Sequence, residues 1–442
     1  MLRLSTSDPD FEKKFARLVD GRRESGDDVS STVAHILDEV RARGDAALAE
    51  YTERFDKHVL ATEDDWRITP EACREAYDAL DPTLRAALEL AAQRIRAYHL
   101  NQLPADRDFT DEAGVRLGAK WHPVDAAGLY VPGGRAAYPS SLLMNAIPAK
   151  VAGVGRIVVV TPTPKGQANP LVLAAAHIAG VDAIWRIGGA QAIAALAYGT
   201  GRIDRVDVIT GPGNDYVAEA KRQLFGVVGI DMVAGPSEIL VVADAGNDPD
   251  WIAADLLSQA EHDPASQSIL ITDDARFADQ VEDRIDVQCS MLATEKVARQ
   301  SWDDNGVVIL VSDLAEAPAL ANRLAAEHVE LAVDDPEVLF ARLRHAGSVF
   351  LGRHTPEAVG DYVAGPNHVL PTGRRARFAS GLSVLDFMKR TSFISMDAAG
   401  LAKIGPAAIA LARAEGLPAH AKSVELRMLD ALPPSATLAR LK

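Results

Sequence analysis

At 442 residues the chain is longer than most single hydrophobic cores, so we expect more than one domain. Its hydrophobic content of 48% is typical of a globular protein, and its net charge of −16 argues against a nucleic-acid or anionic-membrane surface. We see no signal peptide and no apolar run of the roughly 20 residues that span a membrane. Cys73 and Cys289 lie far apart in ordinary contexts, which indicates a cytoplasmic protein whose metal, if any, is held by nitrogen and oxygen.

The first hundred residues are helical in character. Val33, Ile36 and Val40 recur at helical spacing, and Pro70 and Pro82 are placed to open further helices. This part offers scaffold or dimer surface and no catalytic constellation. A short pair of strands is expected over residues 114–121.

From residue 128 the sequence alternates between short apolar strands and helices. A strand over 128–131 leads into a glycine-rich turn that reaches Gly134. Further strands are predicted over 156–161, 183–187, 206–210, 239–244, 268–272, 307–311, 330–333 and 348–351. Buried strands separated by helices are typical of parallel sheets. We therefore expect two α/β domains with a cleft between them, followed by a helical tail.

Two turns of the first series resemble anion-binding turns. Residues 188–191 (GGAQ) and 211–214 (GPGN) each lie between a strand and a helix, where backbone N–H groups and the helix dipole favour a phosphate. The second turn does not match G-x-G-x-x-G, because Asp215 and Tyr216 follow it. Two such turns at one sheet edge nevertheless favour a ligand there, since ligands of open α/β sheets lie outside the carboxyl ends of strands.

Gln259 and His262 stand near the end of a helix expected to begin at Pro249. Three residues apart, they lie on one helix face and could reach one metal ion. Asp263-Pro264 then ends the helix, because the residue before proline avoids the α conformation. An ordinary polar helix end explains the same spacing.

Glu327 and His328 are predicted to end a helix that begins at Leu314. A histidine is the usual general base, and a neighbouring carboxylate can orient it or activate water. The alternative is a histidine that merely stabilises a helix carboxyl end.

Asp361 and His420 could complete an all-nitrogen-and-oxygen site with Gln259 and His262. Such a set suits zinc and tolerates manganese or cobalt. Taken singly, Asp361 is typical of a turn residue, and His420 of a solvated helix end. Spacing cannot join them, because the four residues span much of the chain.

A series of sequence blocks beyond the helical region, in order, resembles the histidinol dehydrogenase family. The blocks are 128–134 (GLYVPGG), 138–154 (YPSSLLMNAIPAKVAGV), 186–200 (RIGGAQAIAALAYGT), 211–226 (GPGNDYVAEAKRQLFG), 229–243 (GIDMVAGPSEILVVA), 254–264 (ADLLSQAEHDP), 326–331 (AEHVEL), 360–372 (GDYVAGPNHVLPT), 380–391 (SGLSVLDFMKRT) and 415–421 (EGLPAHA). Departures are small: Ala325-Ala326 stands where many members have Ala-Pro, and Val329 replaces a common leucine.

The resemblance implies a fold of two incomplete Rossmann-like α/β domains, similar to aldehyde dehydrogenases, in a domain-swapped homodimer. It implies a helical amino-terminal arm over 1–25 and a first α/β domain over 26–129 with 238–380, which carries the metal and catalytic residues. A second, NAD-binding α/β domain is expected over 130–237. A small helical tail over 381–442 is expected to swap to the partner.

The resemblance also implies a reaction: four-electron oxidation of L-histidinol to L-histidine through bound L-histidinaldehyde, with two NAD, as the last step of histidine biosynthesis. His328 would be the general base and Glu327 would activate water. The resemblance implies one zinc ion per subunit, bound by Gln259, His262, Asp361 and His420. It implies contact with NAD by Tyr130, Gln191 and Asn214. The residues implied to contact substrate are Ser237, His368 and Glu415, together with Gln259, His262, His328, Asp361 and His420. Glu415 and His420 are expected to enter the partner's site.

Three alternatives stay open at this point. A relative within the family could oxidise another small polyol such as a sulfopropanediol. An aldehyde dehydrogenase mechanism would use Cys289 as a nucleophile, although its flanking residues show no activating base. A protein that binds the metal without turnover is the third, and the presence of Glu327 and His328 argues against it.

Overall fold

The computed structural model describes residues 1–21, 29–133, 138–233 and 235–430, and the chain divides into two units. The first comprises residues 1–103 and 124–387, and the second comprises 104–123 and 388–442. The expected domain boundary at residue 25 and Gly134 of the glycine-rich turn lie outside the described residues. Within those ranges, no helix is long and apolar enough to cross a membrane.

One sheet of the first unit, sheet A, is parallel throughout. Its strand order is β1 (Leu2–Ser5), β12 (Val307–Leu310), β11 (Gln267–Thr272), β10 (Glu238–Ala243), β13 (His328–Ala332) and β14 (Ser348–Leu351). Counted from β10 along the chain, the strands follow the Rossmann order 3-2-1-4-5, with β1 added at one edge.

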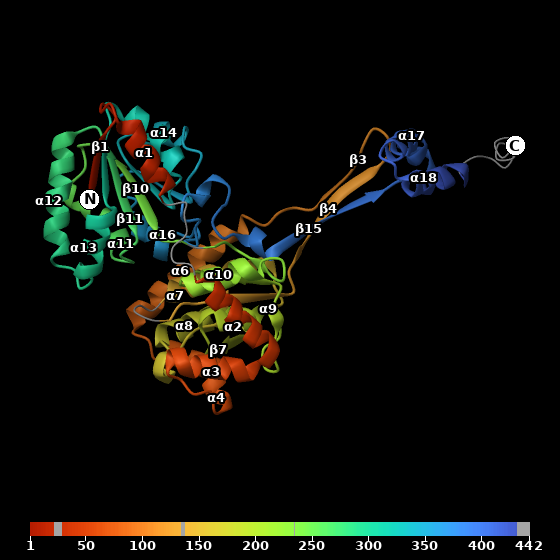
Figure 1. The fold of residues 1–442 in the computed structure, drawn as a ribbon, viewed down its shortest axis with the longest axis horizontal. Helices are drawn as coiled ribbons and strands as arrows, with labels where there is room; N and C mark the ends of the chain where they lie inside the picture. The colour runs from red at the N-terminus through yellow and green to blue at the C-terminus, as the bar shows by residue number, and fades with distance from the viewer. Residues whose placement is uncertain (22–28, 134–137, 234, 431–442) are drawn as a thin grey trace. The chain divides into compact units, whose positions relative to one another are not determined.

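Helices cover both faces of sheet A, as Figure 1 shows. Alternate residues of β10 serve the two faces: Ile239 and Val241 pack toward one set of helices, and Leu240 and Val242 toward the other. The first set is α11 (Pro249–Ala260), α12 (Ala275–Cys289) and α13 (Glu295–Asn305), and the second is α1 (Phe11–Asp20) and α14 (Ala317–Leu324). Burial on both faces explains why these strands are apolar throughout. The short helices α15 (Pro336–Phe340) and α16 (Glu357–Tyr362) follow β13 and β14.

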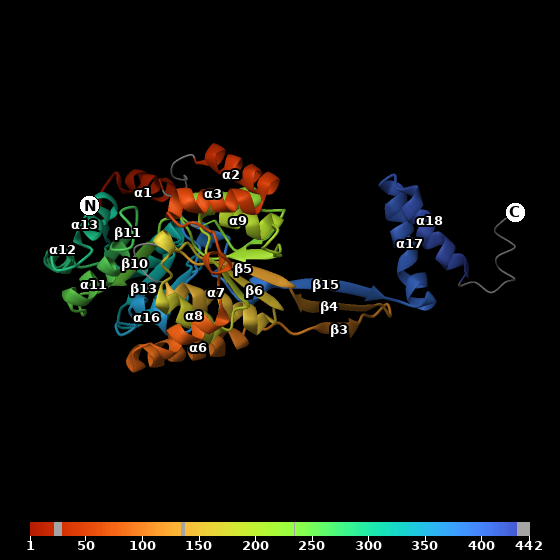
Figure 2. The same ribbon diagram turned by 90° about the horizontal axis from the view of Figure 1, so that it is seen from below.

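The other sheet of the first unit, sheet B, repeats the same topology. Its order is β2 (Arg67–Ile68), β7 (Ala183–Trp185), β6 (Arg156–Val160), β5 (Ala126–Tyr130), β8 (Val208–Thr210) and β9 (Gly229–Ile230), with β2 antiparallel and the rest parallel. One face carries α2 (Ser30–Arg43), α3 (Asp45–Asp56), α9 (Gly189–Tyr198) and α10 (Asp215–Leu224), and the other carries α7 (Pro139–Ala152) and α8 (Pro170–Ala179), as Figure 2 shows. The helices α5 (Pro70–Asp78) and α6 (Pro82–Leu100) pack on α8 and α7, and α4 (Glu63–Trp66) precedes β2.

The prediction of an α/β fold built on two parallel sheets is confirmed, while parts of the expected domain division differ from the structure. Residues of the amino-terminal arm form strand β1, because Leu4 is buried against β12 and the backbone of the segment pairs with it. The helices α2 and α3 pack on sheet B, whereas residues 26–129 were expected to belong with residues 238–380. Their apolar residues, such as Val33 and Ile36, share one hydrophobic core with the alanine-rich helix α9.

The second unit is an antiparallel sheet followed by two helices. Its strand order is β15 (Met388–Ser395), β4 (Arg116–Pro123) and β3 (Arg107–Thr110), and the helices are α17 (Ala398–Ala414) and α18 (Pro418–Asp430). The helices pack closely at Gly405, where a Cβ atom would come within 2.8 Å of the Met428 sulfur. The unit therefore includes residues 104–123, and its carboxyl-terminal segment begins at 388 and not at 381.

Candidate functional site

Glu327 and His328 lie at the amino end of strand β13, and the prediction of a helix end here is wrong. Helix α14 ends at Leu324, and Ala325 adopts a left-handed conformation with φ of +46°. Such a residue ends a helix because it turns the chain away from the helical hydrogen bonds. His328 then pairs with Ile239 of β10 and with Ser348 of β14.

The imidazole of His328 is held by the backbone of a neighbouring strand. Its Nδ1 lies 3.3 Å from the carbonyl oxygen of Glu238, the first residue of β10, so Nδ1 carries the proton that it donates. Nε2 is then the acceptor, and it lies 3.5 Å from Glu357 Oε1 and 4.0 Å from Asp361 Oδ1. Burial lowers the pKa of His328 to about 4, so the free protein holds a neutral imidazole at pH 7.

Glu327 is also held by the backbone of Glu238. Its Oε2 accepts a hydrogen bond of 3.1 Å from the backbone N–H of Glu238. Burial raises the pKa of Glu327 well above the usual range, and the carboxylates of Glu238, Asp361 and Glu357 raise it further. A carboxyl group in such surroundings can serve as a base near neutral pH once a cation is close.

Gln259 and His262 lie side by side at the end of α11. Gln259 is buried in the last turn, His262 follows the helix, and the amide nitrogen of Gln259 lies 3.1 Å from His262 Nδ1. The charge of His262 contributes to lowering the pKa of His328 and of His368, after the larger effect of burial on each. His262 therefore belongs to the same cluster as those two histidines.

Asp361 and His368 also belong to this cluster, because Asp361 Oδ1 lies 4.0 Å from His328 Nε2. His368 Nδ1 donates to the backbone oxygen of Asp361 at 2.9 Å and lies 3.7 Å from its Oδ1. His368 Nε2 lies 3.4 Å from the hydroxyl of Ser141. Ser237 precedes β10, and its carbonyl accepts a 3.0 Å hydrogen bond from the backbone of Gln267.

The cluster fits a divalent cation. Nitrogen and oxygen atoms of His328, Glu357 and Asp361 lie within 4.8 Å of one another. Among the described residues, Gln259 Oε1, His328 Nε2 and Glu357 Oε1 are buried without a hydrogen-bond partner. Buried polar atoms of this kind are costly unless something satisfies them, and the imidazole and carboxylate groups among them are ligand types that zinc accepts.

Glu357 belongs to this cluster as well, although the sequence patterns did not indicate it. It stands four residues before Asp361 on α16, on the same helix face, and Ser258 donates to its Oε2 at 3.3 Å. Burial raises the pKa of Glu357 to about 8, and the neighbouring Asp361 carboxylate adds to the effect. The two acids one turn apart behind Pro356 are the signal that could have identified it.

Glu415 and His420 belong to the second unit. Glu415 caps the carboxyl end of α17, and His420 lies in the first turn of α18; both are exposed. The structure thus places Gln259, His262, Asp361 and His328 in the first unit, whereas Glu415 and His420 belong to the second.

The residues expected to contact NAD lie at the carboxyl edge of sheet B. Tyr130 ends β5, and its hydroxyl accepts a 3.2 Å hydrogen bond from the backbone of Gly189. Gln191 is buried in the first turn of α9. Asn214 is the N-cap of α10, where its side-chain oxygen accepts from Val217 at 3.2 Å. This edge is the usual ligand position in the Rossmann order, whereas Glu327 and His328 lie at the amino edge of sheet A.

A buried ion pair supports the turn after β8. Lys221 donates to the Gly211 carbonyl at 3.0 Å, and Asp231 accepts from the Gly211 N–H at 2.8 Å. Lys221 and Asp231 also pair with each other, with side-chain exposures of 2% and 1%. Gly211 has φ of +110°, and a Cβ there would lie 2.1 Å from the Tyr130 carbonyl oxygen, so only glycine fits.

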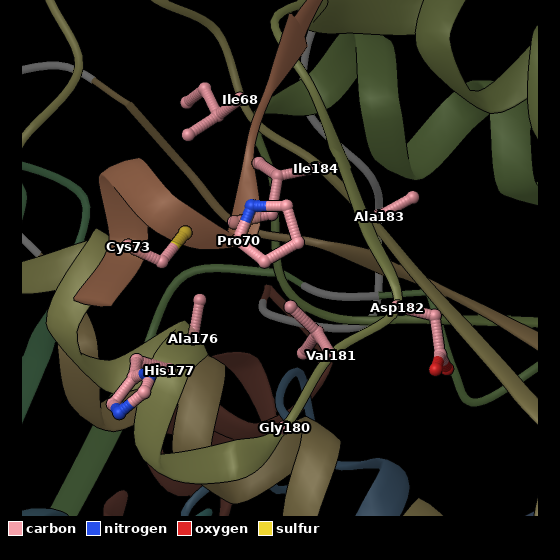
Figure 3. Close-up of a pocket in the computed structure, with 10 residues that line it drawn as sticks. All are labelled: Ile68, Pro70, Cys73, Ala176, His177, Gly180, Val181, Asp182, Ala183 and Ile184. Atoms are coloured by element: carbon pink, nitrogen blue, oxygen red, sulfur yellow. The ribbon is translucent and has the colours of Figure 1, made fainter.

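A cavity of about 130 Å³ lies elsewhere, beside β2 and β7 (Figure 3). Its walls come from α5, α8 and β7, and they include Cys73 and His177. Burial raises the pKa of Cys73 to about 11, which leaves an unreactive thiol. No residue expected to act in catalysis, metal binding or NAD binding lines this cavity.

Comparisons of the sequence and the fold with known proteins identify one family. A family model described as histidinol dehydrogenase matches residues 20–428. The chain is 62% identical to a histidinol dehydrogenase from Zymomonas mobilis, over 97% of this chain and 99% of that protein. It is also 62% identical to one from Rhodospirillum rubrum, over 97% and 98%. The crystal structure of a histidinol dehydrogenase from Elizabethkingia anophelis has a TM-score of 0.91 and 35% identity, covering 97% of this chain and 98% of that one.

Proposed function

The chain belongs to the histidinol dehydrogenase family, an NAD-dependent class of oxidoreductase, and on this premise we propose that it oxidises L-histidinol to L-histidine through L-histidinaldehyde. The reaction would be the last step of histidine biosynthesis and would use two NAD per substrate, because oxidation of an alcohol to an acid removes four electrons. The observation that carries the proposal is the placement of Glu327 and His328 on one backbone residue, Glu238, beside buried side chains that could hold a metal ion.

We assign the zinc site to Gln259, His262 and Asp361 together with His420 of the partner subunit, one ion per subunit. The unpartnered oxygen of Gln259 and the surplus of buried carboxyl groups support a cation here. Bound zinc would supply a fixed template for the imidazole and amine of the substrate. Ser237, His368 and the partner's Glu415 would contact the rest of the substrate.

His328 is the proposed general base of both oxidations. Its Nδ1–H is engaged by the Glu238 carbonyl, so the Nε2 lone pair is left to take the hydroxyl proton. Tyr130, Gln191 and Asn214 would hold NAD, which would accept the hydride in each oxidation. Because His328 is buried, bulk water has little access to it.

Glu327 is the proposed base for hydration of the aldehyde. Its Oε2 is held by the Glu238 N–H, and its other oxygen is left to take a proton from the attacking water. His328 then removes the hydroxyl proton of the hydrate in the second oxidation. Retention of the aldehyde between the two stages follows from anchoring the substrate at atoms that do not react.

We also propose that the protein is a homodimer with shared sites. In the second unit, large apolar side chains are exposed, among them Phe109 at 55%, Ile394 at 68% and Leu411 at 64%. Exposed apolar surface of this kind marks an interaction site. A second copy of the chain would cover it and would bring its own Glu415 and His420 to the site. The two thiols, Cys73 and Cys289, are free, which supports a cytoplasmic setting.

The test is NADH formation from L-histidinol before and after chelation, with zinc added back. We expect two NADH per histidinol, lost with the metal and restored by zinc. His328→Asn should slow both oxidations, whereas Glu327→Gln should slow mainly the oxidation of histidinaldehyde. His35→Asn, at an exposed position on α2, is the matched control.

Three outcomes would overturn parts of this assignment. Turnover of a sulfopropanediol with none of histidinol would reassign the substrate. Equal loss of both half-reactions in Glu327→Gln would refute the division of roles. A folded, zinc-loaded protein that forms no NADH would indicate a binding protein.

A further inference from the structure

We propose that Arg374 and Glu238, a buried ion pair, are positioning residues that set Glu327 and His328 for catalysis. The inference rests on the catalytic roles proposed above. Neither Arg374 nor Glu238 is among the residues to which a contact with metal, NAD or substrate is assigned.

The pair is enclosed within the first unit. Arg374 Nη1 lies 3.2 Å from Glu238 Oε1, and their side chains are 1% and 0% exposed. Arg374 Nη2 also donates to Gln267 Oε1 at 2.7 Å. Gln267 is the first residue of β11 and stands opposite Glu238 in the register of β10 and β11. The guanidinium group therefore ties together the amino ends of two adjacent strands.

Arg374 itself is held in an uncommon backbone conformation. Its φ is +66°, in the left-handed region, just before the short 3₁₀ helix of residues Arg375–Arg377. A non-glycine residue in this region is strained, and the strain persists where the surroundings require it. The arginine side chain lies in the interior, where its guanidinium group contacts Glu238 and Gln267.

The backbone of Glu238 is the point through which this pair acts. Its N–H donates to Glu327 Oε2, and its carbonyl accepts from His328 Nδ1. One residue thus fixes the direction of the Glu327 carboxylate and the tautomer of the His328 ring. Any displacement of Glu238 moves both groups together, and a misplacement of about 1 Å near a reacting centre can cost about 100-fold in rate.

Removing both charges of the pair can distinguish a positioning role from a purely stabilising one. A buried ion pair replaced by apolar residues of similar size is often as stable or more stable, whereas removal of one partner leaves an uncompensated charge. The double variant Arg374→Met/Glu238→Met removes both charges. A purely structural role predicts that it keeps wild-type activity, and a positioning role predicts that it does not.

The experiment compares the double variant, the single variant Arg374→Met and the control Arg377→Met, as zinc-loaded full-length proteins. Arg377 is exposed in the same 3₁₀ helix and bonds the carbonyl of Asn322. We expect kcat for histidinol to fall at least tenfold in both Arg374 variants, with KM for histidinol within threefold and zinc content unchanged. The same loss is expected with histidinaldehyde as substrate, because both catalytic residues depend on Glu238. The control should match the wild type.

A folded double variant with kcat within twofold of the wild type would overturn the proposal, and so would a loss seen only in KM. If Arg374→Met does not fold, the double variant decides alone. His328→Asn is measured in the same experiment, so that failure of the proposed catalytic roles can be distinguished from failure of the positioning role. Wild-type kcat in that variant would refute the catalytic roles, whereas a slow His328→Asn beside a normal double variant would refute the positioning role only.

Discussion

Replacing Lys221 with methionine tests whether the buried ion pair holds the turn that we assign to NAD. Methionine keeps most of the bulk of the lysine stem but removes the charge and the donor to the Gly211 carbonyl. Asp231 is then left almost wholly buried without its cation, although its oxygens still accept from the backbone of Gly211 and Met232.

The cost follows from that uncompensated carboxylate. Breaking a buried pair by removing one partner typically costs about 3–5 kcal/mol. At a denaturant dependence of about 2 kcal/mol per molar urea, the unfolding midpoint should fall by about 2 M. The turn at Gly211 should loosen as well, so we expect KM for NAD to rise about tenfold, equivalent to about 1.4 kcal/mol, with KM for histidinol unchanged.

The assay is urea unfolding followed by tryptophan fluorescence, combined with steady-state kinetics. Trp66 and Trp185 are both buried beside sheet B, so they report on the part of the fold that contains the turn. Arg222→Met is the matched control on the same helix. Arg222 is 56% exposed and pairs with Glu219, and loss of such a surface pair should cost less than about 1 kcal/mol. A Lys221→Met protein within 1 kcal/mol of the wild type, with an unchanged KM for NAD, would refute the reasoning.

Three further changes have distinct expected outcomes. Gly211→Ala places a Cβ against the Tyr130 carbonyl at a φ of +110°, so KM for NAD should rise at least as much as in Lys221→Met; unchanged NAD kinetics would contradict this. Burial raises the pKa of Glu330 to about 9 and that of Asp255 to about 6, so the folded chain holds a proton that the unfolded chain releases at lower pH. Glu330 should therefore make the free energy of unfolding fall by about 1.4 kcal/mol per unit from pH 5 to 8, in addition to what the other buried carboxyl groups contribute, and Glu330→Gln should make the slope shallower by that amount in urea titrations; parallel slopes would argue against it. Cys289→Ser should leave NADH formation unchanged, because burial raises the pKa of this thiol; a folded but inactive variant would restore the cysteine mechanism.

Local sequence patterns predicted most of the parallel sheets and few of the long-range contacts. The strands β10, β11 and β12 are runs of apolar residues buried on both faces, so each is recognisable by itself. Strand β1 is only four residues long, and its partner β12 lies about 300 residues further along the chain. Strand β15 is mostly exposed and has no apolar run, so nothing local distinguishes it from a loop.

The candidate site was predictable where neighbours in sequence are neighbours in space. The side chains of Gln259 and His262 are in contact, as their spacing indicated. Glu327 and His328 were assigned to a helix end, because the alanine-rich segment before them favours a helix and the left-handed residue that ends it is Ala325, not a glycine. The pairing of Arg374 with Glu238 had no signal, because it depends on how distant segments pack.

Strand β1 and helix α1 also constrain how the chain is made. Leu4, Phe11 and Phe15 are synthesised long before Leu240 and Ile309, yet all five residues share one core. The edge that β1 occupies exists only after β12 emerges about 300 residues later, which takes ~15–60 s at ordinary rates of translation. Sheet B can assemble from residues 67–230 during that interval, while the apolar amino-terminal segment stays exposed to chaperones on the ribosome. Residues 2–20 can therefore reach their place only after residues that are synthesised much later.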